Sequence, residues 1–315
     1  MHSFRKSILK LSLFSILPLL IIGYAVFLTG KQTDDFYKRF TSPQQHSLIL
    51  GSSRGSGINP AILDQIIQPK YPNVKFYNYA FTWGHSPYGP KYLESIKKKL
   101  DPATKDGIFV VIVEPTALMV TRSKPDSPEY YVENDKSVAK TNFVNINPNL
   151  EYLIESYDYS LTRALNLKVI PPKNPMANVE VLDNGKMEVK MIKDFSPQKR
   201  IEENKRKMVE FQIRIDELKW SEKREKYLGE TITFLQKHGK VILLRMPIYK
   251  TPYEIENDAV PFFDSRIQEI AKKYKVSYTN YNQIPNHYKS IDEVHLESNS
   301  MNEFSKRLGE KIVSE

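Results

Sequence analysis

Two short motifs, far apart in the chain, supply a serine, a histidine and a carboxylate. Gly51–Arg54 (Gly-Ser-Ser-Arg) follows a short apolar segment, and Asp292–His295 (Asp-Glu-Val-His) precedes the last helical pattern. A serine hydroxyl becomes an effective nucleophile when an imidazole takes its proton, and a carboxylate fixes the tautomer of that imidazole. These residue types indicate acyl transfer or ester hydrolysis. On this chemistry alone, Ser52 and Ser53 are equal candidates for the nucleophile.

The first motif is placed on a predicted strand-to-helix turn. The apolar run Ser47–Leu50 predicts a buried strand, and residues 58–67 predict a helix opened by Asn59-Pro60. A serine at the end of such a strand is well placed to face a ligand.

This arrangement resembles the SGNH/GDSL hydrolase superfamily, in which a Gly-Asp-Ser turn holds the nucleophile and a C-terminal Asp-x-x-His holds the acid and base. Gly51-Ser52-Ser53 stands where Gly-Asp-Ser would be, so the resemblance implies Ser53 as nucleophile, His295 as base and Asp292 as its partner. The chain is most similar to a membrane-anchored branch of bacterial cell envelopes that includes esterases and acyltransferases of surface polymers. The resemblance covers roughly residues 44–312.

The superfamily builds its oxyanion hole partly from a glycine after the second strand and an asparagine after the third. The resemblance implies that the backbone N–H groups of Ser53 and Gly84 face the oxyanion. The asparagine is absent, because the third predicted strand ends in Glu114-Pro115. Losing one such donor costs about a hundred- to a thousandfold in rate. Candidates for a substitute donor are Asn78, Thr82, His85 and Arg54.

Three charged residues near predicted strand ends are candidates for substrate binding. They are Arg54, Glu114 and Arg245. A guanidinium can bind a carboxylate, a phosphate or a sugar hydroxyl, whereas a structural ion pair is the alternative for Arg245. Glu114 can instead orient Arg54. No grouping of residues has metal-ligand spacing, so neither a metal nor a cofactor is expected.

The N-terminus predicts a membrane anchor. The run Ile8–Leu28 is long and apolar enough to span a bilayer as a helix, and no good cleavage site follows it. The distribution of lysine and arginine around the span favours a cytoplasmic N-terminus and an extracytoplasmic main domain. We therefore expect a tail and anchor over residues 1–31, a connector over 32–45 and an α/β domain over 46–315.

Composition narrows the function further. The chain has no cysteine, which excludes disulfides, thiolate metal sites and cysteine nucleophiles. Its net charge of +9 includes four cations and no acid in residues 1–31, so the rest carries +5. That mild surplus suits proximity to an anionic lipid or polymer, and no nucleic-acid-binding motif accompanies it.

Alternating strand and helix patterns predict an α/β domain with helices on both faces of a parallel sheet. The predicted strands are 47–50, 74–78, 108–113, 241–244 and 276–279, and the predicted helices are 58–67, 90–100, 262–273 and 300–312. This alternation of strands and helices indicates a flavodoxin-like three-layer sandwich, as the resemblance also implies. In such a fold, ligands bind at the carboxyl ends of the strands.

Two segments stand outside that minimal pattern. Residues 116–196 form an insertion, with a helical segment at 150–165 and a hairpin at 179–192, that either caps the site or decorates the surface. Residues 197–238 predict one or two charged helices packed on the sheet.

These observations favour a membrane-anchored serine esterase or O-acyltransferase that acts on an acylated glycan or lipid of the cell envelope. A non-catalytic protein of the same fold that binds a glycan or an assembly partner is the first alternative, because the third-strand asparagine is missing. A phosphate-binding loop at residues 51–57, before a helix N-terminus, is the second.

Overall fold

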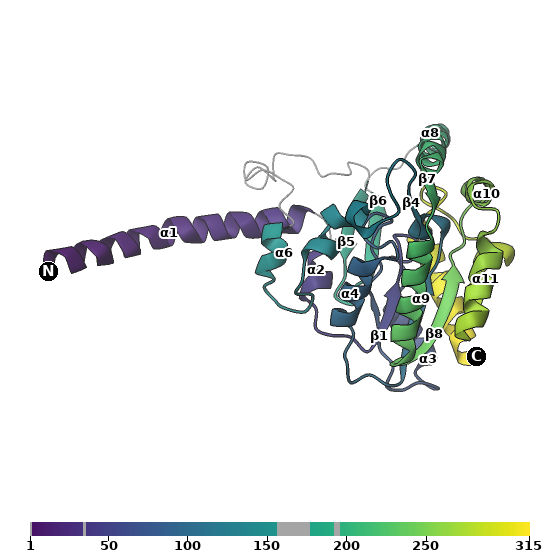
Figure 1. Cartoon of the computed structure of the whole chain (residues 1–315), viewed down its shortest axis with the longest axis horizontal. Helices are drawn as coiled ribbons and strands as arrows, with labels where there is room; N and C mark the ends of the chain where they lie inside the picture. The colour runs from purple at the N-terminus through teal and green to yellow at the C-terminus, as the bar shows by residue number, and fades with distance from the viewer. Residues whose placement is uncertain (1, 34–35, 156–176, 192–195) are drawn as a thin grey trace.

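The computed structural model describes residues 2–33, 36–155, 177–191 and 196–315. Helix α1 (His2–Thr33) projects away from the rest of the chain (Figure 1), and its apolar side chains between Phe4 and Tyr24 are exposed. The stretch Phe4–Ala25 is long and apolar enough to cross a membrane. An exposed apolar helix of this length fits the predicted anchor.

The main domain is built on a five-stranded parallel sheet. Its strands are β1 (Ser47–Leu50), β2 (Phe76–Asn78), β3 (Gly107–Ile112), β8 (Gly239–Arg245) and β9 (Ser277–Asn280). They lie in the order β2-β1-β3-β8-β9, and each neighbouring pair is parallel. The α/β class and the five-stranded parallel sheet are thus confirmed, with strand boundaries within two residues of those predicted.

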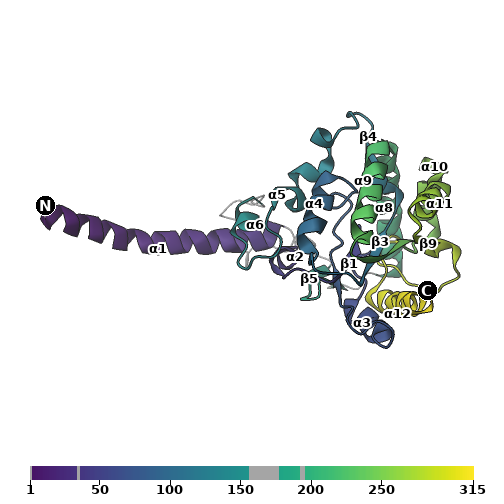
Figure 2. The same ribbon diagram turned by 60° about the horizontal axis from the view of Figure 1, so that its bottom comes forward.

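Helices cover both faces of this sheet because side chains of a strand alternate between its faces. In β1, Leu48 and Leu50 contribute to one hydrophobic cluster, while Ile49 belongs to the other. Figure 2 shows α3 and α12 together on one side of the domain. The covering helices are α3 (Pro60–Ile67) and α12 (Ser298–Ser314) on that face, and α4 (Pro90–Lys99), α9 (Glu222–Gln236) and α11 (Phe263–Tyr274) on the other.

The juxtamembrane residues belong to the domain. Helix α2 (Tyr37–Thr41) places Phe36 and Phe40 in the hydrophobic core, where they are almost fully buried. The side chain of Arg39 is buried as well, and it donates hydrogen bonds to the backbone oxygens of Ala80 and Gly185. The structure therefore places Phe36 and Phe40 against the domain.

The segment 116–196 contributes two separate pieces of structure. Strand β4 (Met119–Thr121) pairs with β7 (Leu218–Trp220), and strands β5 (Ala177–Val181) and β6 (Met187–Met191) form the predicted hairpin. Smaller helices complete it: Pro115–Leu118, Pro128–Tyr130 and Val132–Asp135 are 3-10 helices, and α5 (Ser137–Lys140) and α6 (Leu150–Glu155) are α-helices. The predicted helix beyond residue 155 and the hairpin end at Ile192 lie outside the described residues.

The charged segment 197–238 forms two helices, α8 (Pro197–Asp216) and α9, separated by β7. Helix α10 (Lys250–Ala259) contacts α8, and the 3-10 helix Tyr281–Gln283 contacts β8. The apolar side chains of α8 are buried toward its C-terminal end: Ile215 is 1% exposed, whereas Ile201 is 50% exposed. The N-terminal half of α8 therefore presents a different face to the domain.

Candidate active site

A glycine-dependent turn places Ser53 at the carboxyl end of β1. Gly51 has φ +131°, and a Cβ there would lie 2.7 Å from the Cβ of Ile112. Only glycine fits this exit from the strand without strain. The turn that follows leaves Ser52 1% exposed and Ser53 partly exposed. Ser52 therefore faces the interior, and Ser53 faces a cavity.

The turn is braced just after Ser53. The backbone oxygen of Ser53 accepts hydrogen bonds from the N–H of Ser56 (3.2 Å) and from its hydroxyl (2.7 Å). The side chain of Asn78, at the end of β2, donates to the backbone oxygens of Gly55 and Ile58 at 2.8 and 2.9 Å. These bonds hold the nucleophile candidate on a rigid loop.

The loop before α12 holds Asp292 and His295 as a unit. One Asp292 oxygen accepts the backbone N–H of His295 at 3.0 Å, and both oxygens lie 2.9–3.0 Å from its Nδ1. Between them Glu293 has φ +71°, a left-handed conformation that is uncommon for residues other than glycine. This bend turns the imidazole back over the carboxylate that precedes it.

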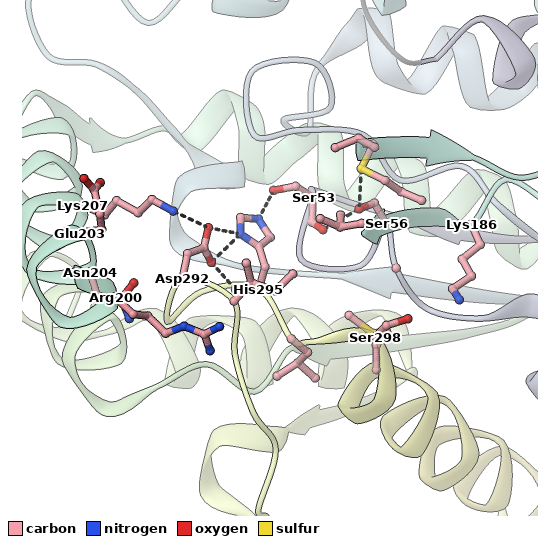
Figure 3. Close-up of a pocket in the computed structure, with 17 residues that line it drawn as sticks. Ser53, Ser56, Lys186, Arg200, Glu203, Asn204, Lys207, Asp292, His295 and Ser298 are labelled. Atoms are coloured by element: carbon pink, nitrogen blue, oxygen red, sulfur yellow. Dashed lines mark hydrogen bonds and ion pairs between the residues drawn. The ribbon is translucent and has the colours of Figure 1, made fainter. Parts of the chain in front are cut away.

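His295 completes a hydrogen-bonded line to the serine. Its Nε2 lies 2.8 Å from the Oγ of Ser53, although the two residues are 242 positions apart. Because the Asp292 carboxylate can only accept, it holds the proton on Nδ1 and leaves Nε2 free to accept the serine hydroxyl. Figure 3 shows the three side chains in this order at the cavity. This is the arrangement of an activated serine.

Packing of α3 against α12 brings the two motifs together. Asn59 caps α3 by accepting the N–H of Ala61 at 3.1 Å. Its own N–H donates to the hydroxyl of Ser305, and its side-chain amide donates to Asn302, both at 3.0 Å. The turn after β1 and the helix that follows the Asp-His loop are therefore fastened to each other beside the site.

The electrostatics favour an ionised Asp292. Burial disfavours its charged form, but electrostatic interaction and hydrogen bonding with His295 and the charge of Lys207 outweigh burial, so the pKa of Asp292 lies below its usual range. The Nζ of Lys207 on α8 is 3.8 Å from Asp292 Oδ2. A permanent negative charge at Asp292 stabilises the imidazolium that proton transfer from serine creates.

A cavity of about 250 Å³ adjoins the line of three residues. The hairpin β5–β6, helix α8 and the start of α12 supply most of its wall. Besides Ser53, Asp292 and His295, it is lined by Ser56, Gly57, Val179, Lys186, Met187, Val189, Arg200, Glu203, Asn204, Lys207, Ile291, Leu296, Ser298 and Met301. The hairpin thus forms one wall, as a capping insertion would.

Sequence reasoning missed the contribution of α8. Arg200, Glu203, Asn204 and Lys207 follow the i, i+3, i+4, i+7 spacing that puts side chains on one helical face. Figure 3 shows all four on the Asp292 side of the site. The spacing of these polar residues is visible in the sequence, but only the fold shows that they face the cavity and not solvent.

The three predicted substrate-binding residues lie instead in a buried ion network. Arg54 Nη2 is 2.6 Å from Glu256 and its Nε is 3.4 Å from Glu114. The other Glu256 oxygen is 2.9 Å from Arg245, which also lies 3.1 Å from Asp264. Arg54, Glu114 and Arg245 are at most 5% exposed. The described cavity wall includes none of them, so the geometry points away from direct substrate contact.

The oxyanion donors are only partly in place. Within the described chain, the N–H groups of Ser53 and Gly84 donate no hydrogen bond and are thus available. Gly84 is buried in the loop after β2, where the Ser86 hydroxyl donates to the Gly51 oxygen at 2.7 Å. That bond ties the glycine loop to the serine turn, although Gly84 is not among the cavity-lining residues described.

The candidate substitute donors are occupied elsewhere. Both protons of the Asn78 amide are used by backbone oxygens, and Thr82 and His85 bond to each other at 2.7 Å. Arg54 is held by Glu114 and Glu256, although its buried Nη1 has no partner in the described chain. Of these four candidates in the described chain, only Arg54 keeps a donor without a partner, and Arg54 does not line the cavity.

Other ligand chemistries fit the site poorly. The N–H groups of Gly55, Ser56 and Ile58 donate to backbone oxygens of the same loop at 3.0–3.2 Å, so they are not available to cradle a phosphate. Among the residues that the structure describes, no group of three or more His, Asp or Glu side chains is arranged to hold a metal ion.

No protein-family model matches this chain, and no curated protein matches it. The functional assignment therefore depends on the geometry of Ser53, His295 and Asp292 and on the cavity beside them.

Proposed function

We propose that this protein is a membrane-anchored serine esterase or O-acyltransferase of the SGNH/GDSL type that acts on an acylated glycan or lipid of the cell envelope. The observation that carries the proposal is the continuous hydrogen-bonded line from Ser53 Oγ through His295 to Asp292, open to a cavity. Such a line is the minimum that nucleophilic serine catalysis requires.

In the acylation step, Ser53 Oγ attacks the carbonyl carbon of the ester while its proton passes to His295 Nε2. The tetrahedral intermediate collapses, the bond to the leaving alcohol breaks, and the imidazolium returns the proton to that alcohol. Asp292 stays ionised throughout and orients the ring. The depressed pKa of Asp292 supports this role.

Deacylation repeats the same proton transfers with a second nucleophile. His295 takes a proton from water or from a sugar hydroxyl, which attacks the acyl-serine and releases the acid or the new ester. A water acceptor makes the protein an esterase, and a sugar hydroxyl makes it a transferase. The polar face of α8, opposite the hairpin, is a suitable surface for the alcohol part of either substrate.

The free N–H groups of Ser53 and Gly84 are the proposed oxyanion donors. With the third donor replaced by Glu114, the rate is expected to be lower by about a hundred- to a thousandfold than with a complete hole. A slow enzyme is compatible with a fixed, membrane-confined substrate at high local concentration.

The proposed location follows from α1 and the charges around it. Arg5, Lys6 and Lys10 lie before or within the start of the span, while the first cations beyond it are Lys31, Lys38 and Arg39. The positive-inside tendency supports a cytoplasmic N-terminus and a main domain outside, where envelope polymers are found.

A serine-reactive fluorophosphonate tests the proposal. The full-length protein in phospholipid nanodiscs is expected to gain one adduct, read as intact mass. The adduct should disappear in Ser53→Ala and His295→Ala and persist in Ser52→Ala, a matched control because Ser52 is adjacent but buried. Absence of an adduct on the wild-type protein would contradict the proposal.

The alternative, a non-catalytic protein that binds a glycan or a partner through the same cavity, has one observation in its favour. Glu114 stands where the family has an amide donor, and it is buried beside Arg54. On this alternative, Ser53→Ala leaves function intact and the fluorophosphonate does not react.

A further inference from the structure

The cavity beside Ser53 combines polar residues of α8 with an apolar lining from the hairpin and from the chain around α12. Beyond Asp292 lie the polar residues of α8, whereas Ser56 and Lys186 lie on the other side of Ser53 (Figure 3). The apolar part of the lining comes from the hairpin and from the chain around α12; it consists of Val179, Met187, Val189, Ile291, Leu296 and Met301. An apolar surface next to an activated serine is suited to the acyl part of an ester.

The hairpin wall is fastened to the catalytic turn itself. The N–H of Met187 donates to the backbone oxygen of Ser56 at 2.7 Å, and the Met187 sulfur lies 3.6 Å from the Ser56 hydroxyl. The N–H of Asn78 donates to the Asn184 oxygen at 3.0 Å, and Arg39 donates to the Gly185 oxygen at 2.7 Å. This wall is therefore held in register with Ser53 and is anchored to the juxtamembrane segment.

The size of the cavity indicates which acyl groups fill it. An apolar cavity of about 150 Å³ holds a six-carbon benzene ring. A volume of about 250 Å³ therefore accommodates a chain of roughly six to ten carbons. A two-carbon acetyl group would leave most of the apolar lining without contacts.

We propose that this cavity binds a medium-length acyl chain, and that the hairpin β5–β6 determines which chain length is preferred. The proposal rests on the proposed function and adds the substrate class, a medium-chain ester and not an acetyl ester. Val189 and Val179, whose Cα atoms belong to facing strands in direct register, are the specificity-determining pair.

The expected chain-length dependence follows from the burial of methylene groups. Each methylene buried against an apolar wall is worth about fourfold in rate or affinity. The acylation rate should therefore rise by about that factor for each added methylene from acetyl to the chain that fills the cavity, and then level off or fall. A site that contacts only the carbonyl shows no such rise.

The test uses p-nitrophenyl esters of acetate, butyrate, hexanoate, octanoate and dodecanoate with the full-length protein in nanodiscs. The burst of p-nitrophenol reports acylation even where deacylation is slow. Val189→Phe, which narrows the cavity, should lower the hexanoate-to-acetate rate ratio at least tenfold, and Val189→Ala should move the optimum to a longer chain. Glu180→Phe adds the same ring at an exposed position of the hairpin. It should change neither the hexanoate-to-acetate rate ratio nor the optimal chain length.

The outcomes separate the two proposals. The acyl-chain proposal is overturned if the protein gains the fluorophosphonate adduct but acylation rates are equal for all chain lengths, or if Val189→Phe keeps the chain-length preference. In either case the proposed serine enzyme is still supported. Absence of both the adduct and the burst overturns both. Acetyl and hexanoyl esters of methyl glucoside and of glycerol, compared as pairs, then distinguish a glycan alcohol from a lipid one, with hexanoyl expected to be the better substrate of each pair.

Discussion

Ser53 and Arg54 are adjacent in the chain but belong to two different polar regions. The first region is the hydrogen-bonded line from Ser53 to Asp292, which is partly exposed at a cavity. The second is the ion network of Arg54, Glu114, Glu256 and Arg245, which is almost fully buried. The first can meet a substrate and exchange protons, whereas the charged groups of the second are held by one another in the interior. Exposure, and not residue type, separates a reactive site from a structural one.

The largest effect is expected for Ser53→Ala. Loss of the nucleophile should lower the acylation rate by about 10⁴-fold or more. The free energy of unfolding should change by no more than about 1 kcal/mol, because only one partly exposed hydrogen bond is lost. The two tryptophans, Trp83 and Trp220, provide a fluorescence signal for denaturant unfolding. A large loss of stability would instead assign Ser53 to the structural region.

Asp292→Asn is expected to reduce the rate by about 10⁴-fold, since an amide can stabilise the wrong tautomer of His295. The same change should flatten the acid limb of the stability curve. The folded-state pKa of Asp292 is depressed, so its contribution to stability is present above the unfolded pKa and is lost as pH falls toward the folded one. Unfolding measured from pH 6 down to pH 2 should show a shallower slope for the variant.

Glu256→Gln tests the buried region. Removing the carboxylate leaves Arg54 and Arg245 as poorly compensated buried charges, which should cost about 3–5 kcal/mol of stability. Burial disfavours the ionised form of Glu256, but Arg54 and Arg245 outweigh burial and depress the pKa of Glu256. The carboxylate therefore stabilises the fold fully above the pKa that it has in the unfolded chain, and this contribution declines at lower pH. Glu254→Gln on the same helix α10, an exposed position, is the control. The fraction of Glu256→Gln that remains folded should still react with the fluorophosphonate.

The smallest effect is expected for Lys207→Met. Lys207 lies 3.8 Å from Asp292 and is one-third exposed, so its charge is partly screened by solvent. We expect an acylation rate that is lower by about 1.4- to fivefold, with recovery in Lys207→Arg, because such exposed pairs contribute only about 0.2–1 kcal/mol. The acylation rate is measured with the p-nitrophenyl esters. An unchanged rate in Lys207→Met would mean that α8 forms part of the cavity wall but does not assist Asp292 through the charge of Lys207.

Local patterns in the sequence were sufficient to predict the elements. The alternation of apolar segments with helical periodicity predicted the parallel sheet and the helices at 262–273 and 300–312. These helices pack on the core through Phe263, Ile267 and Phe304, which are at most 1% exposed. Turn chemistry predicted the hairpin around Asn184-Gly185, where φ of Gly185 is +80°. These predictions succeeded because burial and backbone conformation act over a few residues.

Long-range placement was beyond such patterns. The charges of Arg54, Glu114 and Arg245 suggested substrate contacts, yet they meet one another and Glu256 in the interior, 202 residues along the chain from Arg54. The sequence predicted charged helices packed on the sheet over residues 197–238, yet the polar stripe of α8 lines the cavity. Whether a charged side chain forms an ion pair depends on the residue that the fold places beside it. A short stretch of sequence does not contain that residue.

The sequence by itself determined the residue types of the site, the glycine-dependent turn at the end of β1, the strand rhythm of the sheet and an apolar helix long enough to span a membrane. Only the tertiary structure decided that Ser53 and not Ser52 meets His295, because the two hydroxyls differ in direction and not in chemistry. It also decided that the hairpin and α8 enclose the space beside that serine. The first outcome depends on the packing of α3 against α12, which brings residues 242 positions apart to within a hydrogen bond. The second depends on contacts such as the hydrogen bond from the N–H of Met187 to the backbone oxygen of Ser56.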